Sequence, residues 1–209
     1  MSHEPPVSTA LVRTARAIAA RSTSGELPEY INKDEVDRVL AGLEAKPRVR
    51  ALVRFLWLTG CRISEALVVL VSDLDMNLRI VQVRTLKKRR PERRSLPLPP
   101  AYLGELALIF LARAEANQDY DLPREARVFP WSRSRAFELV RDACLAAGIE
   151  RRRCHPHVFR HGHAIFALKN GVPLNVLQRA LGHGFLSTTA LYTKVTGDDV
   201  AREYERIAW

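Results

Sequence analysis

The stretch HPHVFRHGHAIFALKNGVPLNVLQRALGHGFLSTTALYTK, residues 155–194, predicts two helices and carries polar residues that core packing alone would not select. Apolar residues recur at helical spacing through its first half, and Gly171 with Pro173 ends the first helix. His157 and Arg160 stand three residues apart, so they share one face of that helix. The pattern therefore places an imidazole beside a guanidinium.

A second, shorter helix is predicted from Leu174 to Leu181, where Gly182 ends it. His183 follows this end directly, and Tyr192 lies nine residues further on in a Thr-rich segment. A single His at a helix end, or a single exposed Tyr, is usually structural, because short motifs produce many false matches. Two imidazoles, a guanidinium and a phenol together instead indicate a chemical site.

Arg62 lies at a turn between two strongly apolar predicted helices. The first begins at Pro47 and ends at Gly60, and the second is ISEALVVL, residues 63–70. A guanidinium near buried surface is costly without a partner, so Arg62 requires an anion. That anion is either a bound substrate or, in a purely structural interpretation, the carboxylate of Glu65 or Asp73.

A basic hairpin follows. Residues 80–83 are rich in β-branched side chains and SLPLP, residues 95–99, returns, which predicts two antiparallel strands. Seven basic residues lie from Arg84 to Arg94, and Glu92 is the single acidic residue among them. Charge runs are often solvated faces, but these like charges would repel one another unless an anion approached, which favours contact with phosphates. The expected contacts are Arg89, Arg90, Arg93 and Arg94.

The composition points in the same direction. Of 209 residues, 33 are Lys or Arg and 23 are Asp or Glu, which leaves a net charge of +10 and indicates a polyanionic partner such as nucleic acid. Three cysteines, an odd number without framework spacing, predict reduced thiols in an intracellular compartment. No apolar run approaches the ~18 residues of a membrane span.

The rest of the chain predicts further helices and two terminal segments. The helices are a capped helix from Asn32 to Leu43, one from Ala101 to Ala114, and one from Ser132 or Ser134 to Ala147. Residues 1–28 are expected to form an arm or linker. Residues 198–209 carry apolar residues along one side, too few to fold alone, so this tail is expected to dock on something.

Five separated motifs in this order resemble the tyrosine recombinase (phage integrase) family. They are TGCRISEAL at residues 59–67, the hairpin around Lys87, H-x-x-R at His157, L-G-H ending at His183, and Y-T at Tyr192. The resemblance covers roughly residues 30–197 and implies a mostly helical α+β fold with a small antiparallel sheet. It makes residues 29–209 a catalytic domain, whose tail helix at residues 198–209 would dock on a neighbouring copy. The alternative is a tail helix that folds back on its own domain. Larger members carry a separate DNA-clamping domain before it, and the present chain is similar in length to the short recombinases that invert fimbrial promoters.

The resemblance also implies a role for each site residue. Tyr192 would be the nucleophile that forms a 3′-phosphotyrosyl link, with Arg62 and Arg160 as the phosphate clamp, His157 as proton acceptor, His183 as a further phosphate donor and Lys87 as general acid. Lys88 is the alternative to Lys87, because hairpin register cannot be fixed from sequence. The implied partners are double-stranded DNA, three further copies of the chain in a tetramer on paired sites, and accessory DNA-bending proteins. Neither metal nor ATP is implied, and the expected location is the cytoplasm, at the nucleoid.

Three other interpretations remain open. A metal-independent DNA-relaxing enzyme of the type IB topoisomerase kind would share this chemistry. A basic helical chain could also be a non-catalytic DNA-binding regulator. Finally, Cys154 with four histidines forms a dense cluster that could hold zinc, although its spacing distributes the side chains partly around a helix; the histidines are His155, His157, His161 and His163.

Overall fold

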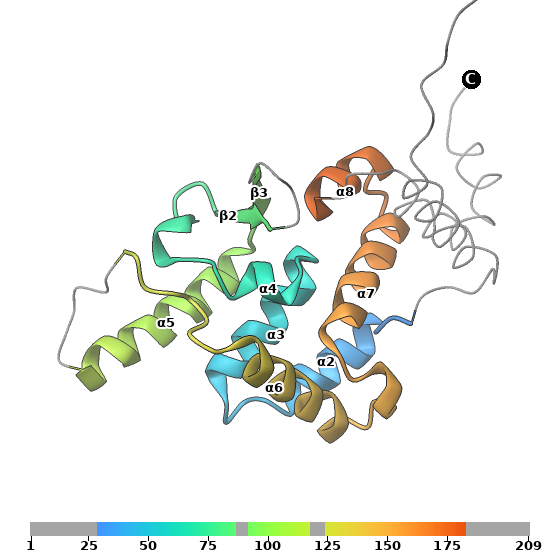
Figure 1. The fold of residues 1–209 in the computed structure, drawn as a ribbon, viewed down its shortest axis with the longest axis horizontal. Coiled ribbons are helices and arrows are strands. Elements are labelled where there is room, and N and C mark those ends of the chain that lie inside the picture. Colours follow the sequence, from blue (N-terminus) through green and yellow to red (C-terminus); the bar gives the residue numbers. More distant parts are fainter. Residues whose placement is uncertain (1–28, 87–91, 118–123, 183–209) are drawn as a thin grey trace, which may run out of the picture.

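The computed structural model describes residues 29–86, 92–117 and 124–182. These residues form a mostly helical α+β fold with one small antiparallel sheet, as predicted (Figure 1). In chain order the elements are α2 (Lys33–Ala41), α3 (Pro47–Thr59), α4 (Ile63–Ala66), the 3-10 turn η1 (Val71–Asp73), β1 (Leu74–Asp75), β2 (Ile80–Thr85), β3 (Glu92–Pro97), α5 (Pro100–Asn117), α6 (Arg133–Ala146), the 3-10 turn η2 (Arg151–Arg153), α7 (Pro156–Lys169) and α8 (Leu174–Leu181).

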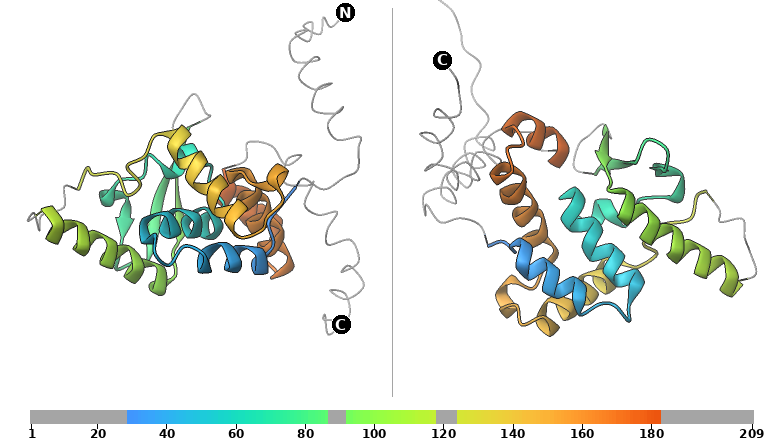
Figure 2. Two further views of the ribbon diagram at one scale, coloured as in Figure 1. Left: turned by 90° about the horizontal axis from the view of Figure 1, so that it is seen from below. Right: turned by 180° about the vertical axis from the view of Figure 1, so that it is seen from behind.

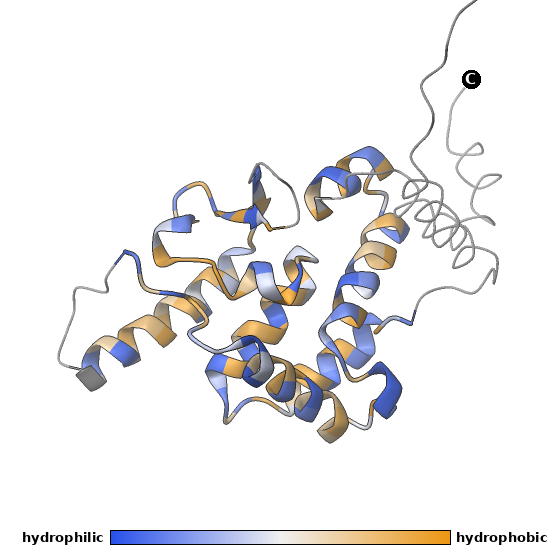
Figure 3. Ribbon diagram, viewed as in Figure 1, coloured by the Kyte–Doolittle hydropathy of each residue, from blue (hydrophilic) through white to orange (hydrophobic). Residues whose placement is uncertain are grey.

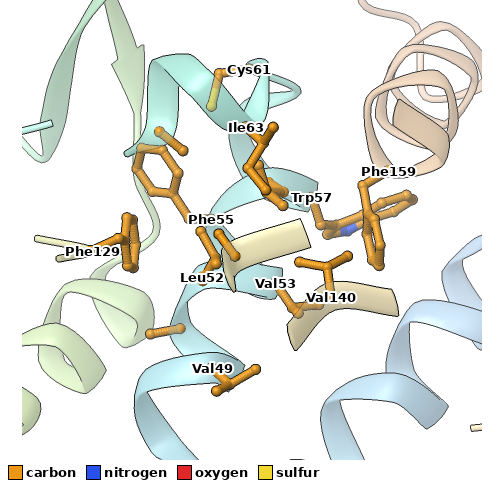
Figure 4. Packing of buried hydrophobic residues seen from close by; sticks show 14 of the residues in the cluster. Val49, Leu52, Val53, Phe55, Trp57, Cys61, Ile63, Phe129, Val140 and Phe159 are labelled. Atoms are coloured by element: carbon orange, nitrogen blue, oxygen red, sulfur yellow. The ribbon is translucent and has the colours of Figure 1, made fainter. Parts of the chain in front are cut away.

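Helix α3 is the centre of the fold. It packs against α2, α4, α5, α6 and α7, and the two further views show it enclosed between these helices (Figure 2). Most of its residues are buried, including Phe55, whose ring lies 5.3 Å from that of Phe129 (Figure 4). A helix that is apolar on most sides is stable only in such an interior position. The elements around α3 are therefore held in fixed positions relative to one another.

The sheet has the order β1-β2-β3 with antiparallel neighbours. Val83 pairs with Arg94 and Val81 with Leu96 in the β2–β3 ladder. Because side chains alternate between the faces of a strand, Arg94 lies on the same inner face as the buried Leu96, whereas Arg93 and Ser95 face outward. This register decides which basic residues of the hairpin can reach solvent.

Two glycines permit close approaches between elements. Gly60 ends α3 with φ +58, and a Cβ there would lie 2.6 Å from the ring of His163 on α7. Gly162 lies in α7, where a Cβ would overlap the carbonyl oxygen of Ile31. Both positions set how closely α7 packs against the rest of the domain.

One predicted helix is shorter than expected. The helix predicted for residues 63–70 ends at Ala66, and the chain then extends to pair with residues 124–128. Val71 donates to the carbonyl of Ala126 at 2.9 Å, and Val128 donates to that of Val69 at 3.0 Å. The apolar, β-branched run suits an extended segment whose residues alternate between buried and half-buried positions, so the helical prediction was wrong there. Within the described ranges, the other predicted helices and both strands are confirmed.

Helix α5 extends away from the domain and is apolar along most of its length (Figure 3). Leu108 and Leu111 on it are 69% and 51% exposed. No helix within the three described ranges is long and apolar enough to cross a membrane.

Candidate active site

Arg62 follows the Gly60 turn and begins α4. Its guanidinium Nη1 lies 3.1 Å from Oε1 of Glu65, and its side chain keeps 19% of its surface exposed. The ion pair expected in the purely structural interpretation is therefore present, and the partner of Arg62 is Glu65. The other candidate partner, Asp73, instead accepts from Arg93 at 3.1 Å.

The Glu65 carboxylate pairs with a second guanidinium besides that of Arg62. Its carboxylate is buried, and Oε2 also accepts from Nη2 of Arg94 at 2.7 Å and from the backbone N–H of Arg62 at 3.0 Å. Burial acts to raise the pKa of Glu65, but the bonds from Arg94 and from the Arg62 backbone outweigh it and hold the pKa below its ordinary value. One negative charge thus faces two guanidiniums, which leaves a net positive charge around Arg62.

Arg160 lies on α7 and is 4% exposed. Its Nη1 donates to the carbonyl of Gly60 at 2.8 Å, and its Nη2 donates to that of Leu181 at 2.9 Å. Gly60 is two residues before Arg62, and Leu181 is two residues before His183. Arg160 therefore connects the turn that carries Arg62 to the end of α8. The predicted pair of arginines, Arg62 and Arg160, thus meets at the Gly60 turn.

The histidines of α7 differ in their surroundings. His157 is exposed in the first turn, and its ring centre lies 6.4 Å from those of His155 and His161. Burial lowers the pKa of His161 to about 4, and the neighbouring charges of His157 and Arg160 act in the same direction. His161 is therefore neutral at pH 7.

The zinc interpretation has no support from the geometry. Within the described ranges, no three His, Cys, Asp or Glu side chains are placed to hold a metal ion. Nδ1 of His163 contacts the carbonyl of Trp57 at 2.8 Å, while the Cys154 thiol points to the carbonyls of Ile149 and Glu150. These side chains diverge instead of converging on one point.

The hairpin prediction needs a correction. Arg94 was expected to contact phosphates, but its side chain is 9% exposed and bonds inward. Arg93 is 53% exposed and pairs with Asp73, to which Arg84 also lies at 4.0 Å. Two buried carboxylates, Glu65 and Asp73, therefore oppose the basic run, whereas the sequence pattern indicated opposition by Glu92 alone.

Several predicted residues lie outside the described ranges. They are Lys87 and its alternative Lys88, Arg89, Arg90, His183 and Tyr192, together with the segments 1–28 and 198–209. The structure thus places Arg62, His157 and Arg160 of the six predicted catalytic residues.

Sequence reasoning missed the buried contacts that Glu65 and Arg94 make beside Arg62. Glu65 was considered simply as a rival partner for Arg62, although a Glu inside the apolar run ISEALVVL was itself a signal of a buried charge network. The inward position of Arg94 follows from its alternation with Leu96 on β3. No single-residue signal distinguishes it from Arg93 without the register.

A groove of about 980 Å³ opens between α3 and α5, and its walls include Arg50, Arg54, Glu105, Leu108 and Leu111. Of the predicted catalytic residues, the three that the structure describes do not line it. The Arg62 and Arg160 site is therefore separate from this groove.

The profile of the Phage integrase family matches residues 29–198. The tyrosine recombinase XerD of Caulobacter vibrioides is 32% identical over 196 residues, which cover 90% of this chain and 64% of the relative. The crystal structure of XerA recombinase is similar with a TM-score of 0.68 at 26% identity, over 88% of this chain and 65% of that one.

A third structure, XerH site-specific recombinase bound to a palindromic difH substrate in a post-cleavage complex, is similar with a TM-score of 0.70 at 21% identity. It is matched over 88% of this chain and 55% of its own, and at that identity the likeness shows the fold. The chain spans between 55% and 65% of the length of these relatives. Because the family profile matches most of its residues and the fold agrees, the chain belongs to the phage integrase family.

Proposed function

We propose that the chain is a site-specific DNA recombinase that cuts and rejoins DNA through a 3′-phosphotyrosyl intermediate. The carrying observation is the partly exposed Arg62 guanidinium, beside the Gly60 turn that Arg160 holds, with one buried carboxylate facing more than one guanidinium. A fixed guanidinium fork suits the non-bridging oxygens of a phosphodiester, and the positive balance favours the charge that builds in the transition state. Of the relatives named above, XerD is a tyrosine recombinase and XerA is a recombinase.

In the proposed reaction the Tyr192 oxygen attacks the phosphorus. The bond from phosphorus to the 5′ oxygen breaks, and a bond from phosphorus to the tyrosine oxygen replaces it. His157 accepts the phenol proton, and Lys87, or Lys88, gives a proton to the leaving 5′ oxygen. Arg62 and Arg160 hold the phosphate, and His183 adds a further hydrogen bond to it. The phosphotyrosine ester conserves the bond energy, so strand exchange uses neither a metal nor ATP.

His157 suits proton transfer because it is exposed at the start of α7, on the same helix as Arg160. The phenol of a tyrosine has an ordinary pKa near ~10, so it needs such an acceptor at neutral pH. His161 is half-buried, whereas His157 is exposed, so His157 is the more accessible of these two imidazoles.

The remaining proposals concern architecture and partners. Residues 29–209 form the catalytic domain, residues 1–28 are an arm, and the tail of residues 198–209 docks on a neighbouring copy within a tetramer that bridges two double-stranded DNA sites. Accessory DNA-bending proteins assist this assembly, which acts on DNA at the cytoplasmic nucleoid. The net charge of +10 supports a DNA partner.

Strand exchange separates this proposal from a relaxing topoisomerase or a binding protein. The intact chain is incubated in EDTA with plasmids that carry two copies of its binding site, recovered by selection from randomised duplexes. We expect excision or inversion between the copies, and loss of it on deletion of residues 198–209 while DNA binding remains. Relaxation of supercoils that needs no paired sites would favour the topoisomerase, and binding without breakage would favour the regulator.

A further inference from the structure

We infer that Arg94 is a positioning residue that keeps the Arg62 guanidinium available to DNA and fixes the end of α8. This inference rests on the proposed function, because it concerns how the same phosphate site is held. Arg94 is not one of the proposed catalytic residues. Its effect is transmitted through Glu65 and through the backbone of α8.

The contacts of Arg94 connect its own strand, β3, to three other elements. Nη1 donates to Oγ1 of Thr85 on the facing strand at 2.9 Å, and Nη2 donates to Glu65 at 2.7 Å. Nε donates to the carbonyl of Ala180 at 2.7 Å. Each nitrogen of the guanidinium therefore has a different partner, on β2, α4 and α8. Strand β3 and α8 lie side by side in the structure (Figure 1).

The end of α8 is held by two arginines at once. The carbonyls of Ala180 and Leu181, in the last turn, accept from Arg94 and Arg160 respectively. Carbonyls in the last turn have no partner within the helix, and the helix dipole favours positive charge there. Gly182 follows with φ +66, and a Cβ on it would lie 3.1 Å from Nη1 of Arg94. The Arg94 side chain thus packs against the glycine that ends α8.

Arg94 also occupies one of the two carboxylate oxygens of Glu65. One carboxylate oxygen faces the Arg62 guanidinium at 3.1 Å, and the other is taken by Arg94 at 2.7 Å. Without Arg94, the second oxygen would have no charged partner while remaining buried, which is costly. The nearby Arg62 side chain would then be drawn to both oxygens in a bidentate pair. Such a pair would hold Arg62 away from the DNA phosphate.

A double-mutant cycle tests this indirect action. The rate constant of covalent adduct formation is measured in single turnovers with a nicked duplex carrying the selected site, at saturating DNA. Misfolded protein lowers the amplitude of such a reaction, whereas mispositioning lowers the rate constant. We expect Arg94→Gln to lower the rate constant about tenfold or more in the intact chain, and by a smaller factor when Arg62 is already Ala, because only the contact with the end of α8 then remains to be lost.

A second background avoids removing a catalytic group. With Glu65→Gln the residue at position 65 no longer carries a charge that draws Arg62, so Arg94→Gln should again have a smaller effect than in the intact chain. The matched control is Arg153→Gln. Arg153 also connects elements through a carboxylate, Glu35 at 2.6 Å, and a backbone carbonyl, but it contacts none of the proposed site residues within the described ranges. It should lower the melting temperature without changing the rate constant.

Each outcome decides the inference. An equal loss from Arg94→Gln in all three backgrounds, or an equal loss of rate constant from Arg153→Gln, would show a general structural effect and overturn it. An unchanged rate constant for Arg94→Gln in an adduct-forming protein would overturn this inference and leave the proposed function standing. Absence of any adduct from the intact chain would remove both.

Discussion

Truncation of Glu65 to Ala should destabilise the domain far more than truncation of a surface carboxylate that pairs with an arginine at the same three-residue spacing. Glu65 is 0% exposed and accepts from two guanidiniums and one backbone N–H. Its removal leaves the Arg94 guanidinium, 9% exposed, without its charged partner. Breaking such a buried pair typically costs about 3–5 kcal/mol, so we expect a decrease of this size in the free energy of unfolding.

The matched control is Glu138→Ala. Glu138 pairs with Arg135 at the same three-residue spacing, but the two side chains are 46% and 58% exposed, so solvent screens the pair. Its removal should cost less than about 1 kcal/mol. Both variants are unfolded in urea and followed by circular dichroism at 222 nm. Equal shifts of the midpoint for the two variants would refute the argument that Glu65 is the buried centre of the network.

The remaining predictions concern packing, pH, salt and metal. Gly162→Ala should destabilise the protein by several kcal/mol, because its Cβ would overlap a backbone oxygen. Gly104→Ala should instead stabilise it by about 0.5–1 kcal/mol, since nothing lies near that helical position. Thermal unfolding checks both variants, and similar shifts of the two melting temperatures would contradict the packing described for Gly162. Stability should rise from pH 4 to pH 6.5 by up to about 3 kcal/mol through His161, because the folded state disfavours its protonation, and His161→Gln should flatten part of that slope in urea titrations. Replacing Arg89 and Arg90 by Ser should reduce the slope of log K against log salt by about 0.9 for each phosphate that the hairpin no longer neutralises, and an unchanged slope would make the hairpin tip a solvated face. EDTA should leave adduct formation unchanged, and an inhibition that zinc reversed would revive the metal interpretation.

The sequence predicted most helices because their ends carry strong local signals. The capping box from Asn32 to Glu35 and the left-handed glycines at Gly60 and Gly182 act within a few residues, so the chain order alone reveals them. The run after Ala66 was mispredicted because a short apolar segment fits a buried helix and a buried extended segment equally well. Pairing with residues 124–128, which are far away in sequence, decides between them.

The site shows the same division between local and distant information. Arg62, His157 and Arg160 could be singled out because their motifs are contiguous. The role of Arg94 could not be predicted in this way, because it depends on strand register and on two contacts with partners that lie 29 and 86 positions away in the sequence. The same register separates Arg94 from Arg93, two adjacent residues of identical chemistry, into an inward and an outward position.

The most direct test of the central claim is to identify the residue that becomes joined to DNA. The intact chain is mixed in EDTA with a nicked duplex carrying its selected site, and the adduct that survives denaturation is digested and mapped by mass spectrometry. We predict a nucleotide on the Tyr192 peptide, linked through the 3′ phosphate, and no adduct from Tyr192→Phe, which should still bind the DNA. An adduct on another residue, or one that forms as fast with Tyr192→Phe, would contradict the proposed mechanism.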